Sequence, residues 1–187
     1  MNCREEVNQL QQELRTISED ARNEFGRLNR EQLNWKPSAE RWSVAQCFDH
    51  LINSNAGYIP IFDAVATGTL KQTFIRKIPG APKIWGQLLI KSLDPKTTRK
   101  LKAPKKFQPA SSDLSASIIA DFAQIQSRVL ESMERMKNLD IDRTIISSPA
   151  TSLVTYSVLD ACRIVVVHEQ RHFQQAQRVM ADSNFPA

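Results

Sequence analysis

The three histidines of this chain have a spacing that suits a metal ion. His168 and His172 are four residues apart in the segment HEQRH, and His50 ends the segment WSVAQCFDH far upstream. Because four residues make about one turn of an α-helix, the downstream pair shares one face and could bind one ion. A third imidazole from another helix would complete a three-nitrogen site with open positions for water or substrate. Structural zinc sites usually have four ligands, so the pattern predicts a catalytic kind of metal site.

Such an open site could support two kinds of reaction. A divalent ion lowers the pKa of a water or thiol that it binds, so the same three ligands suit hydrolysis or thiol transfer. Imidazole binds several metals, and the candidates are Zn or Ni first, with Mn or Fe as alternatives. A single histidine on an apolar face is more often a core residue, but that interpretation must account for all three histidines at once.

The segment HEQRH also matches the H-E-x-x-H pattern of zinc proteases, in which the glutamate is a general base. Those proteases take a third ligand downstream of the second histidine. Here only fifteen residues follow His172, and Asp182 is the only acid among them. The chain also lacks the predicted sheet that such proteases use to hold an extended substrate. A protease is therefore disfavoured.

The histidines must be positioned by helices, because hydrophobic periodicity along the chain is almost wholly helical. Four long helices are predicted. In the first, apolar residues recur at steps of three and four from Val7 to Leu28. The second begins after Ser43, which forms a capping-box pattern with Gln46, and runs through His50 toward Val65. Trp42, just before the cap, is expected to pack against the first turn.

The two later helices are predicted in the same way. A start signal at residues 111–113 precedes an apolar stripe from Leu114 to Met136, and this third helix is expected to end near Asn138. A loop that contains Pro149 leads to Ser157, a candidate cap for the last helix. The β-branched run within RIVVVHEQ would suggest a strand in isolation, but the segment continues without a breaker, so we predict one helix through it.

The predicted helices place each histidine well inside its helix, at mid-height. Packed helices lie about 10 Å apart, so facing histidines on antiparallel neighbours can meet around an ion. Helix-bundle cores are known hosts of such sites.

The positive charge of the chain is concentrated in one segment. Residues 67–109 contain nine Lys and two Arg against Asp94 alone, a local balance of +10, and the rest of the chain has a balance of -5. This basic segment could be a solvated connection, or it could attract an anionic substrate, an acidic partner or a membrane surface. Nucleic acid is the weakest option, because no recognition motif orders its aromatic residues. The sequence KIWGQLLIKSL, between Pro82 and Pro95, could form a short helix.

Length and composition predict one domain, residues 1–187, with a core of its own. No apolar run approaches the roughly 18 residues of a membrane span, and the charged N-terminus does not resemble a signal peptide. We therefore expect a cytoplasmic protein without a transmembrane segment. The three cysteines are odd in number and widely spaced, which argues against a disulfide framework.

The segment WSVAQCFDHL, the long first helix and the terminal HEQRHFQQAQ resemble the DinB-like superfamily, specifically its DinB_2-type branch. The resemblance covers most of the chain outside the basic segment. It implies an all-α fold, a four-helix bundle in an up-down-down-up arrangement, with residues 67–109 as a long insert between the second and third helices. It also implies a divalent ion held by His50, His168 and His172. Members of the family are described as metal-dependent hydrolases, or as transferases that use a low-molecular-weight thiol, and many form homodimers.

Three further residues are candidates for a catalytic role. Asn53 lies three residues beyond His50 on the same predicted helix face. Glu169 adjoins His168, and we expect it to be a solvated or salt-bridged carboxylate; the functional alternative is a carboxylate that orients an imidazole or shuttles a proton. Arg171 matches the family's H-x-x-R-H pattern; we expect a structural ion pair there, with an anchor for an anionic group as the functional alternative. Cys47, on an apolar face, is expected to pack in the core.

Two classes of function therefore follow from the sequence. The first is a small-molecule thiol S-transferase or hydrolase with the three-histidine metal site. The second is a non-catalytic, metal-stabilised binding protein whose basic segment forms an interaction surface.

Overall fold

The computed structural model describes residues 2–71, 80–97, 103–109 and 112–187, and its regular structure is almost entirely helical. The long helices are α1 (Cys3–Phe25), α3 (Val44–Ala66), α5 (Ile118–Met136) and α6 (Val158–Met180). The shorter elements are α2 (Arg30–Asn34), α4 (Ala81–Leu93), the 3-10 helix η2 (Lys105–Phe107) and two strands, β1 (Ile145–Ser147) and β2 (Thr155–Ser157). The predicted all-α class is confirmed.

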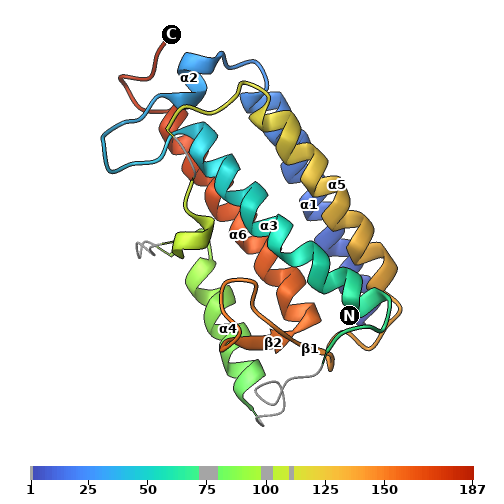
Figure 1. Ribbon diagram of the computed structural model, residues 1–187. Helices are drawn as coiled ribbons and strands as arrows, with labels where there is room; N and C mark the ends of the chain where they lie inside the picture. The colour runs from blue at the N-terminus through green and yellow to red at the C-terminus, as the bar shows by residue number, and fades with distance from the viewer. Residues whose placement is uncertain (1, 72–79, 98–102, 110–111) are drawn as a thin grey trace.

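The four long helices lie side by side and share one core (Figure 1). Helix α3 packs against α5 and α6, and α1 packs against the same two helices. Four buried phenylalanines connect all of them. The ring of Phe25 on α1 lies 5.4 Å from Phe48 on α3 and 5.4 Å from Phe173 on α6, while Phe48 lies 5.1 Å from Phe122 on α5. These edge-to-face contacts add to the burial of large apolar area at the centre of the core.

The predicted helix starts are confirmed for α3 and α6. Ser43 accepts from the backbone of Gln46 in a complete capping box, and Ser157 accepts from the backbone of Asp160. The prediction for α5 was wrong by several residues, because this helix begins at Ile118. The side chain of Asn34 bonds both the N–H and the carbonyl of Leu114. The N–H and the carbonyl of Leu114 are therefore bonded to a side chain of another segment, and α5 starts only after this residue.

The connection from α5 to α6, predicted as a loop, contains a two-stranded antiparallel hairpin. Ile146 pairs with Tyr156, and β2 leads directly into α6. The Tyr156 hydroxyl lies 2.8 Å from that of Tyr58 on α3, so the hairpin is tied to the helices that carry the histidines. Strands of three residues are too short to show a period in the sequence.

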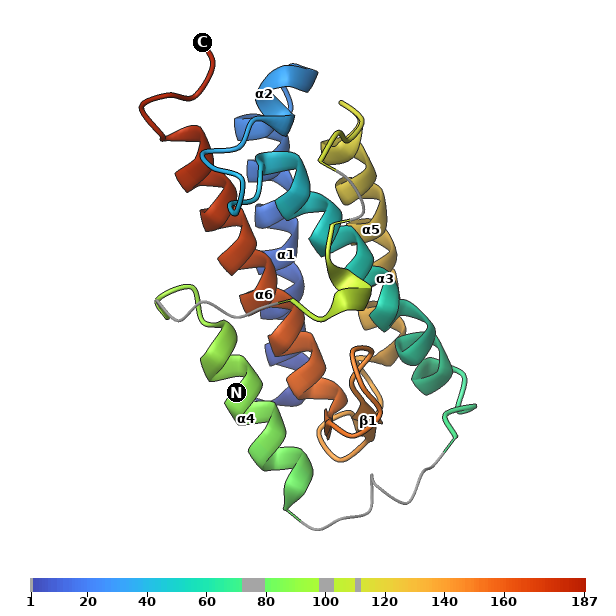
Figure 2. The same cartoon turned by 60° about the vertical axis from the view of Figure 1, so that its left-hand side comes forward.

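The short helix predicted between Pro82 and Pro95 is confirmed as α4. It packs against α6 and β2, and Figure 2 shows it beside the first half of α6. At Gly86 the two helices approach closely, because an added Cβ would lie 2.5 Å from Oδ2 of Asp160. Within the basic segment, residues 72–79 and 98–102 lie outside the described residues.

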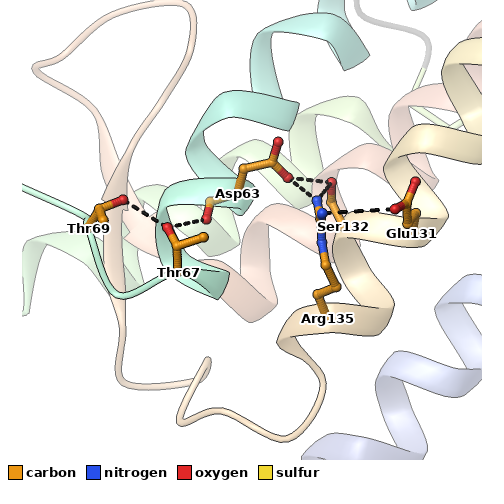
Figure 3. A network of polar contacts seen from close by, with 6 residues as sticks. All are labelled: Asp63, Thr67, Thr69, Glu131, Ser132 and Arg135. Atoms are coloured by element: carbon orange, nitrogen blue, oxygen red, sulfur yellow. Dashed lines mark hydrogen bonds and ion pairs between the residues drawn. The ribbon is translucent and has the colours of Figure 1, made fainter.

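A polar network joins the end of α3 to α5 (Figure 3). The Asp63 carboxylate accepts from Ser132 Oγ at 2.9 Å and from the guanidinium of Arg135, which also pairs with Glu131 at 3.9 Å. The side chains of Asp63 and Arg135 are 43% and 48% exposed, so water and salt screen their charges. The ion pair therefore contributes no more than about 1 kcal/mol to stability.

None of the described helices combines the length and the apolar character needed to cross a bilayer.

Candidate metal centre

The three histidines converge at the interface between α3 and α6. The ring centroids of His50 and His172 lie 4.5 Å apart, those of His168 and His172 4.7 Å, and those of His50 and His168 4.9 Å. One ligand atom from each residue lies within 4.8 Å of the other two. The predicted meeting of three imidazoles that are far apart in the sequence is confirmed.

The spacing of these nitrogens fits a single divalent ion. In a tetrahedral site, two nitrogens that each lie about 2.1 Å from one ion are about 3.4 Å apart. The Nε2 atoms of His50 and His168 are 3.0 Å apart, and all the ligand atoms lie within 4.8 Å of one another, so the widest separation needs to close by no more than about 1.4 Å. Over the described parts of the chain, no fourth His, Cys, Asp or Glu joins the group. The cluster could therefore hold a metal ion and leave coordination positions for other ligands.

Two of the imidazoles are oriented by hydrogen bonds from Nδ1. His50 Nδ1 lies 2.6 Å from the carbonyl oxygen of Phe107, and because a carbonyl only accepts, this nitrogen carries the proton. His172 Nδ1 lies 3.0 Å from Oε1 of Gln175, to which it donates in the same way. Each ring therefore keeps its Nε2 lone pair for a metal. Contacts of this kind set the tautomer and orientation of histidine ligands.

Burial keeps the three imidazoles neutral. It lowers the pKa of His50, although the bond to Phe107 acts in the opposite direction. Burial lowers the pKa of His172 to about 3, and it lowers that of His168 well below its ordinary value. The neighbouring imidazoles lower the last two pKa values further, because a second positive charge nearby is unfavourable. Neutral imidazole is the form that binds metal.

Trp42 covers one side of the cluster. Its ring lies 5.0 Å from that of His50 and stacks on His172 at 5.6 Å with an interplanar angle of 23°. The residue directly precedes Ser43, and the cap of α3 therefore holds it in place. Its packing at the start of α3 was predicted, but its contact with two ligands was not.

Glu169 lies in the protein core. It is 0% exposed, and its carboxylate accepts from Asn55 Nδ2 at 2.7 Å and from Gln126 Nε2 at 2.5 Å. The Gln126 amide also donates to the carbonyl of Leu14 on α1. The expectation of a solvated carboxylate was wrong, because the turn of about 100° from His168 directs this side chain into the space between α1, α3 and α5. Burial raises the pKa of Glu169 to about 8, while the two amides act in the opposite direction.

The other two candidate residues lie nearer the surface. Asn53 is half-buried on α3, one turn after His50. Arg171 donates from Nη1 to the carbonyls of Asp94 and Thr97, both at 3.2 Å, and so ties α6 to the segment that follows α4. Catalytic roles for Asn53, Glu169 and Arg171 stay predictions.

Sequence reasoning missed four residues: two that bond a histidine of the cluster and two that bond Glu169. They are Phe107, Gln175, Asn55 and Gln126. Gln175 could have been found, since it lies three residues after His172 on the same helix and could reach it. The Phe107 carbonyl leaves no signal in a sequence, because every residue has one. Cys47, for which packing was expected, is buried in the core, and burial raises the pKa of its thiol to about 12.

A family model for the DinB superfamily matches residues 5–176, a range that contains all three histidines. The chain belongs to the DinB superfamily. Among known proteins it is similar to the uncharacterized protein YuaE of Bacillus subtilis (strain 168), with 26% identity over 165 residues, which cover 84% of this chain and 88% of that protein. No solved structure matches the chain. The family predicted from the residues is thus confirmed.

Proposed function

We propose that this DinB-superfamily protein is a metal-dependent enzyme, either a small-molecule thiol S-transferase or a hydrolase. The proposal rests on one observation. Three imidazoles from α3 and α6 converge within 4.8 Å, and no further His, Cys, Asp or Glu of the described residues joins them. Three ligands with positions left over are typical of catalytic metal sites.

The proposal includes a finer description of the fold. The four long helices form an up-down-down-up bundle, residues 67–109 are an insert within it, and residues 1–187 are a single cytoplasmic domain that forms a homodimer. The side-by-side packing of α1, α3, α5 and α6 and the family match over residues 5–176 support the bundle.

The residues around the cluster have separate tasks in this proposal. The metal, Zn or Ni first and Mn or Fe as alternatives, supplies a nucleophile near neutral pH by lowering the pKa of a water or of a low-molecular-weight thiol. The Phe107 carbonyl and Gln175 hold two imidazoles in the tautomer that presents Nε2. Trp42 excludes water from one side of the cluster.

The three candidate catalytic residues each have a role beside the metal in this proposal. Asn53, on the ligand helix α3, orients a polar group of the substrate. Arg171 holds the segment after α4 near His172 and supplies a positive charge for an anionic substrate. Glu169 bonds Asn55 on α3 and Gln126 on α5, and so fixes α6 beside His168.

A second candidate function is a non-catalytic binding protein in which the metal stabilises the fold. The burial of the ligands favours it, because His50 and His172 are only 3% and 9% exposed and Trp42 stacks on the latter. In that case the basic segment, residues 67–109, provides the interaction surface.

Metal analysis and turnover measurements test the first proposal. The purified protein should contain close to one divalent ion per chain, and a panel of low-molecular-weight thiols with a chromogenic electrophile, together with chromogenic esters, should show turnover. His168→Ala should remain helical and lose both the ion and the turnover. Gln174→Ala, an exposed substitution on the same helix, is the matched control and should keep both.

The result also separates the two candidate functions. Metal bound at full stoichiometry, with a large loss of stability on chelation and no turnover with any substrate class, would favour the binding protein. Turnover at the full rate in His168→Ala would contradict the metal mechanism.

A further inference from the structure

Helix α4 has apolar side chains on two opposite faces. Its inner face packs on α6 through Gly86, and Leu89, Ile90 and Leu93 pack against the core. Its outer face carries three large apolar side chains that are exposed to a large extent. They are Ile84, Trp85 and Leu88, with exposed fractions of 64%, 41% and 55%.

These three side chains form one strip. Ile84 and Leu88 are four residues apart and therefore lie one above the other on the helix surface, with Trp85 at their flank. The close approach of Gly86 to Asp160 determines which face of α4 points inward, so the strip is held outward. A contiguous exposed apolar strip with polar residues around it marks an interaction surface.

Positive charge surrounds the strip. Lys83 and Lys91 are exposed on α4, and Lys96 follows shortly after its end. Asp94 is the single acidic residue between positions 80 and 97. The strip thus combines apolar contacts with a local excess of cations, which selects an anionic partner.

We propose that α4 docks its outer strip, Ile84, Trp85 and Leu88, on an anionic lipid surface. Leu, Ile and Trp are the side chains that enter the boundary between headgroups and acyl chains, and lysines on the same helix pair with lipid phosphates. At 13 residues the helix is about 20 Å long, which is shorter than the roughly 30 Å of a hydrocarbon core. Helix α4 therefore lies along the surface.

The charges favour this occupant over a second copy of the chain. A dimer through the outer strip would bring Lys83 and Lys91 of one copy close to those of the other, and like charges at close range are unfavourable. An anionic lipid surface provides both an apolar layer and phosphates, and the binding of an interfacial helix grows with its buried apolar area and with its attraction to anionic lipids.

Partition onto vesicles tests the proposal. The full chain should sediment with vesicles of equal parts phosphatidylcholine and phosphatidylglycerol, with a partition coefficient at least about tenfold higher than on phosphatidylcholine alone. Binding should weaken as salt increases, because salt screens the lysines. Tryptophan emission should shift to shorter wavelength on the anionic vesicles, and Trp85→Phe should remove most of that shift.

Variants distinguish insertion of the apolar strip into the lipid surface from adsorption of the protein by charge alone. Ile84→Gln combined with Leu88→Gln, which keeps the net charge, should lower the partition coefficient at least about tenfold while the helical circular dichroism stays unchanged, since both side chains are exposed. Leu139→Gln is the control at unchanged charge, because Leu139 is 43% exposed in the connection between α5 and β1, and it should partition like the wild type.

Three results would overturn the proposal. One is no binding to anionic vesicles at low salt. Another is equal partition of the double variant and the wild type, which would mean that charge alone adsorbs the protein. The third is binding of polyglutamate through Ile84 and Leu88 without any binding to vesicles, which would identify an acidic polypeptide as the partner.

Discussion

The imidazole Nδ1 of His50 lies 2.6 Å from the carbonyl oxygen of Phe107, although the two residues are 57 positions apart. A residue near the end of the basic segment therefore orients a candidate metal ligand on α3. The Phe107 ring is buried and lies against α3 beside Gly57, where an added Cβ would be 3.5 Å from it. This packing keeps the carbonyl in place, so the end of the basic segment, at Phe107, contributes to the site.

Phe107→Ala should weaken metal binding by about tenfold, since loss of a contact that orients a histidine ligand typically costs 10- to 100-fold. The carbonyl remains in this variant, but the ring that positions it is lost. Competition with a chromogenic chelator measures the affinity. Gln108→Ala, an exposed neighbour, is the control and should bind like the wild type. Equal affinity in both variants would show that the carbonyl is held without the ring.

Glu169→Ala should destabilise the protein by roughly 3 kcal/mol and leave the metal stoichiometry unchanged. The substitution creates a cavity and removes the acceptor for the buried amides of Asn55 and Gln126. Urea denaturation of the metal-free protein measures the free energy of unfolding, and elemental analysis measures the bound ion. Loss of the ion at unchanged stability would instead assign Glu169 to the metal site.

Gly86→Ala should displace α4 from α6 and cost about 1–3 kcal/mol, as is usual for overpacked contacts. The new Cβ would meet the Oδ2 and Cγ of Asp160 at 2.5 Å and 2.9 Å. Asp160 cannot easily move aside, because it is bonded by Arg163. Limited proteolysis within α4 and thermal unfolding report the change, with the exposed Gln87→Ala as control. If the Gly86→Ala variant were cleaved at the wild-type rate, the contact between α4 and α6 would be loose enough to accept the added Cβ.

The buried thiols should be unreactive in the folded protein. Burial raises the pKa of Cys47 and Cys162 to about 12, so little thiolate is present at neutral pH. Iodoacetamide followed by mass spectrometry should label Cys3, which is only partly buried, well before the other two. Labelling of Cys47 as fast as Cys3 would contradict the burial of the Cys47 thiol in the core.

The same shifts predict a loss of stability in alkali. The folded pKa of about 12 lies above the ordinary thiol value of 9.0, so the folded protein keeps protons that the unfolded chain releases. The stability due to these two thiols is fully present below pH 9 and is lost as pH rises toward 12. The free energy of unfolding should therefore fall in this range, and Cys47→Ala should reduce the slope.

The long helices and the ligand set were available from the sequence. Apolar steps of three and four along α1, the Ser43 and Ser157 caps, and the four-residue spacing of His168 and His172 are local patterns. Each of these patterns lies within a short window of the sequence, so they could be predicted without a structure. The β1–β2 hairpin is too short to leave such a pattern.

Only the tertiary structure decided which side chains of different helices contact one another. It brought His50 to 3.0 Å from His168, turned Glu169 inward to Asn55 and Gln126, and placed the Phe107 carbonyl against His50. Each of these contacts joins residues of distant segments, and its energy depends on packing geometry that no short window of sequence encodes. Residue types thus determined which chemistry was available, and helix packing determined which side chains could take part in it.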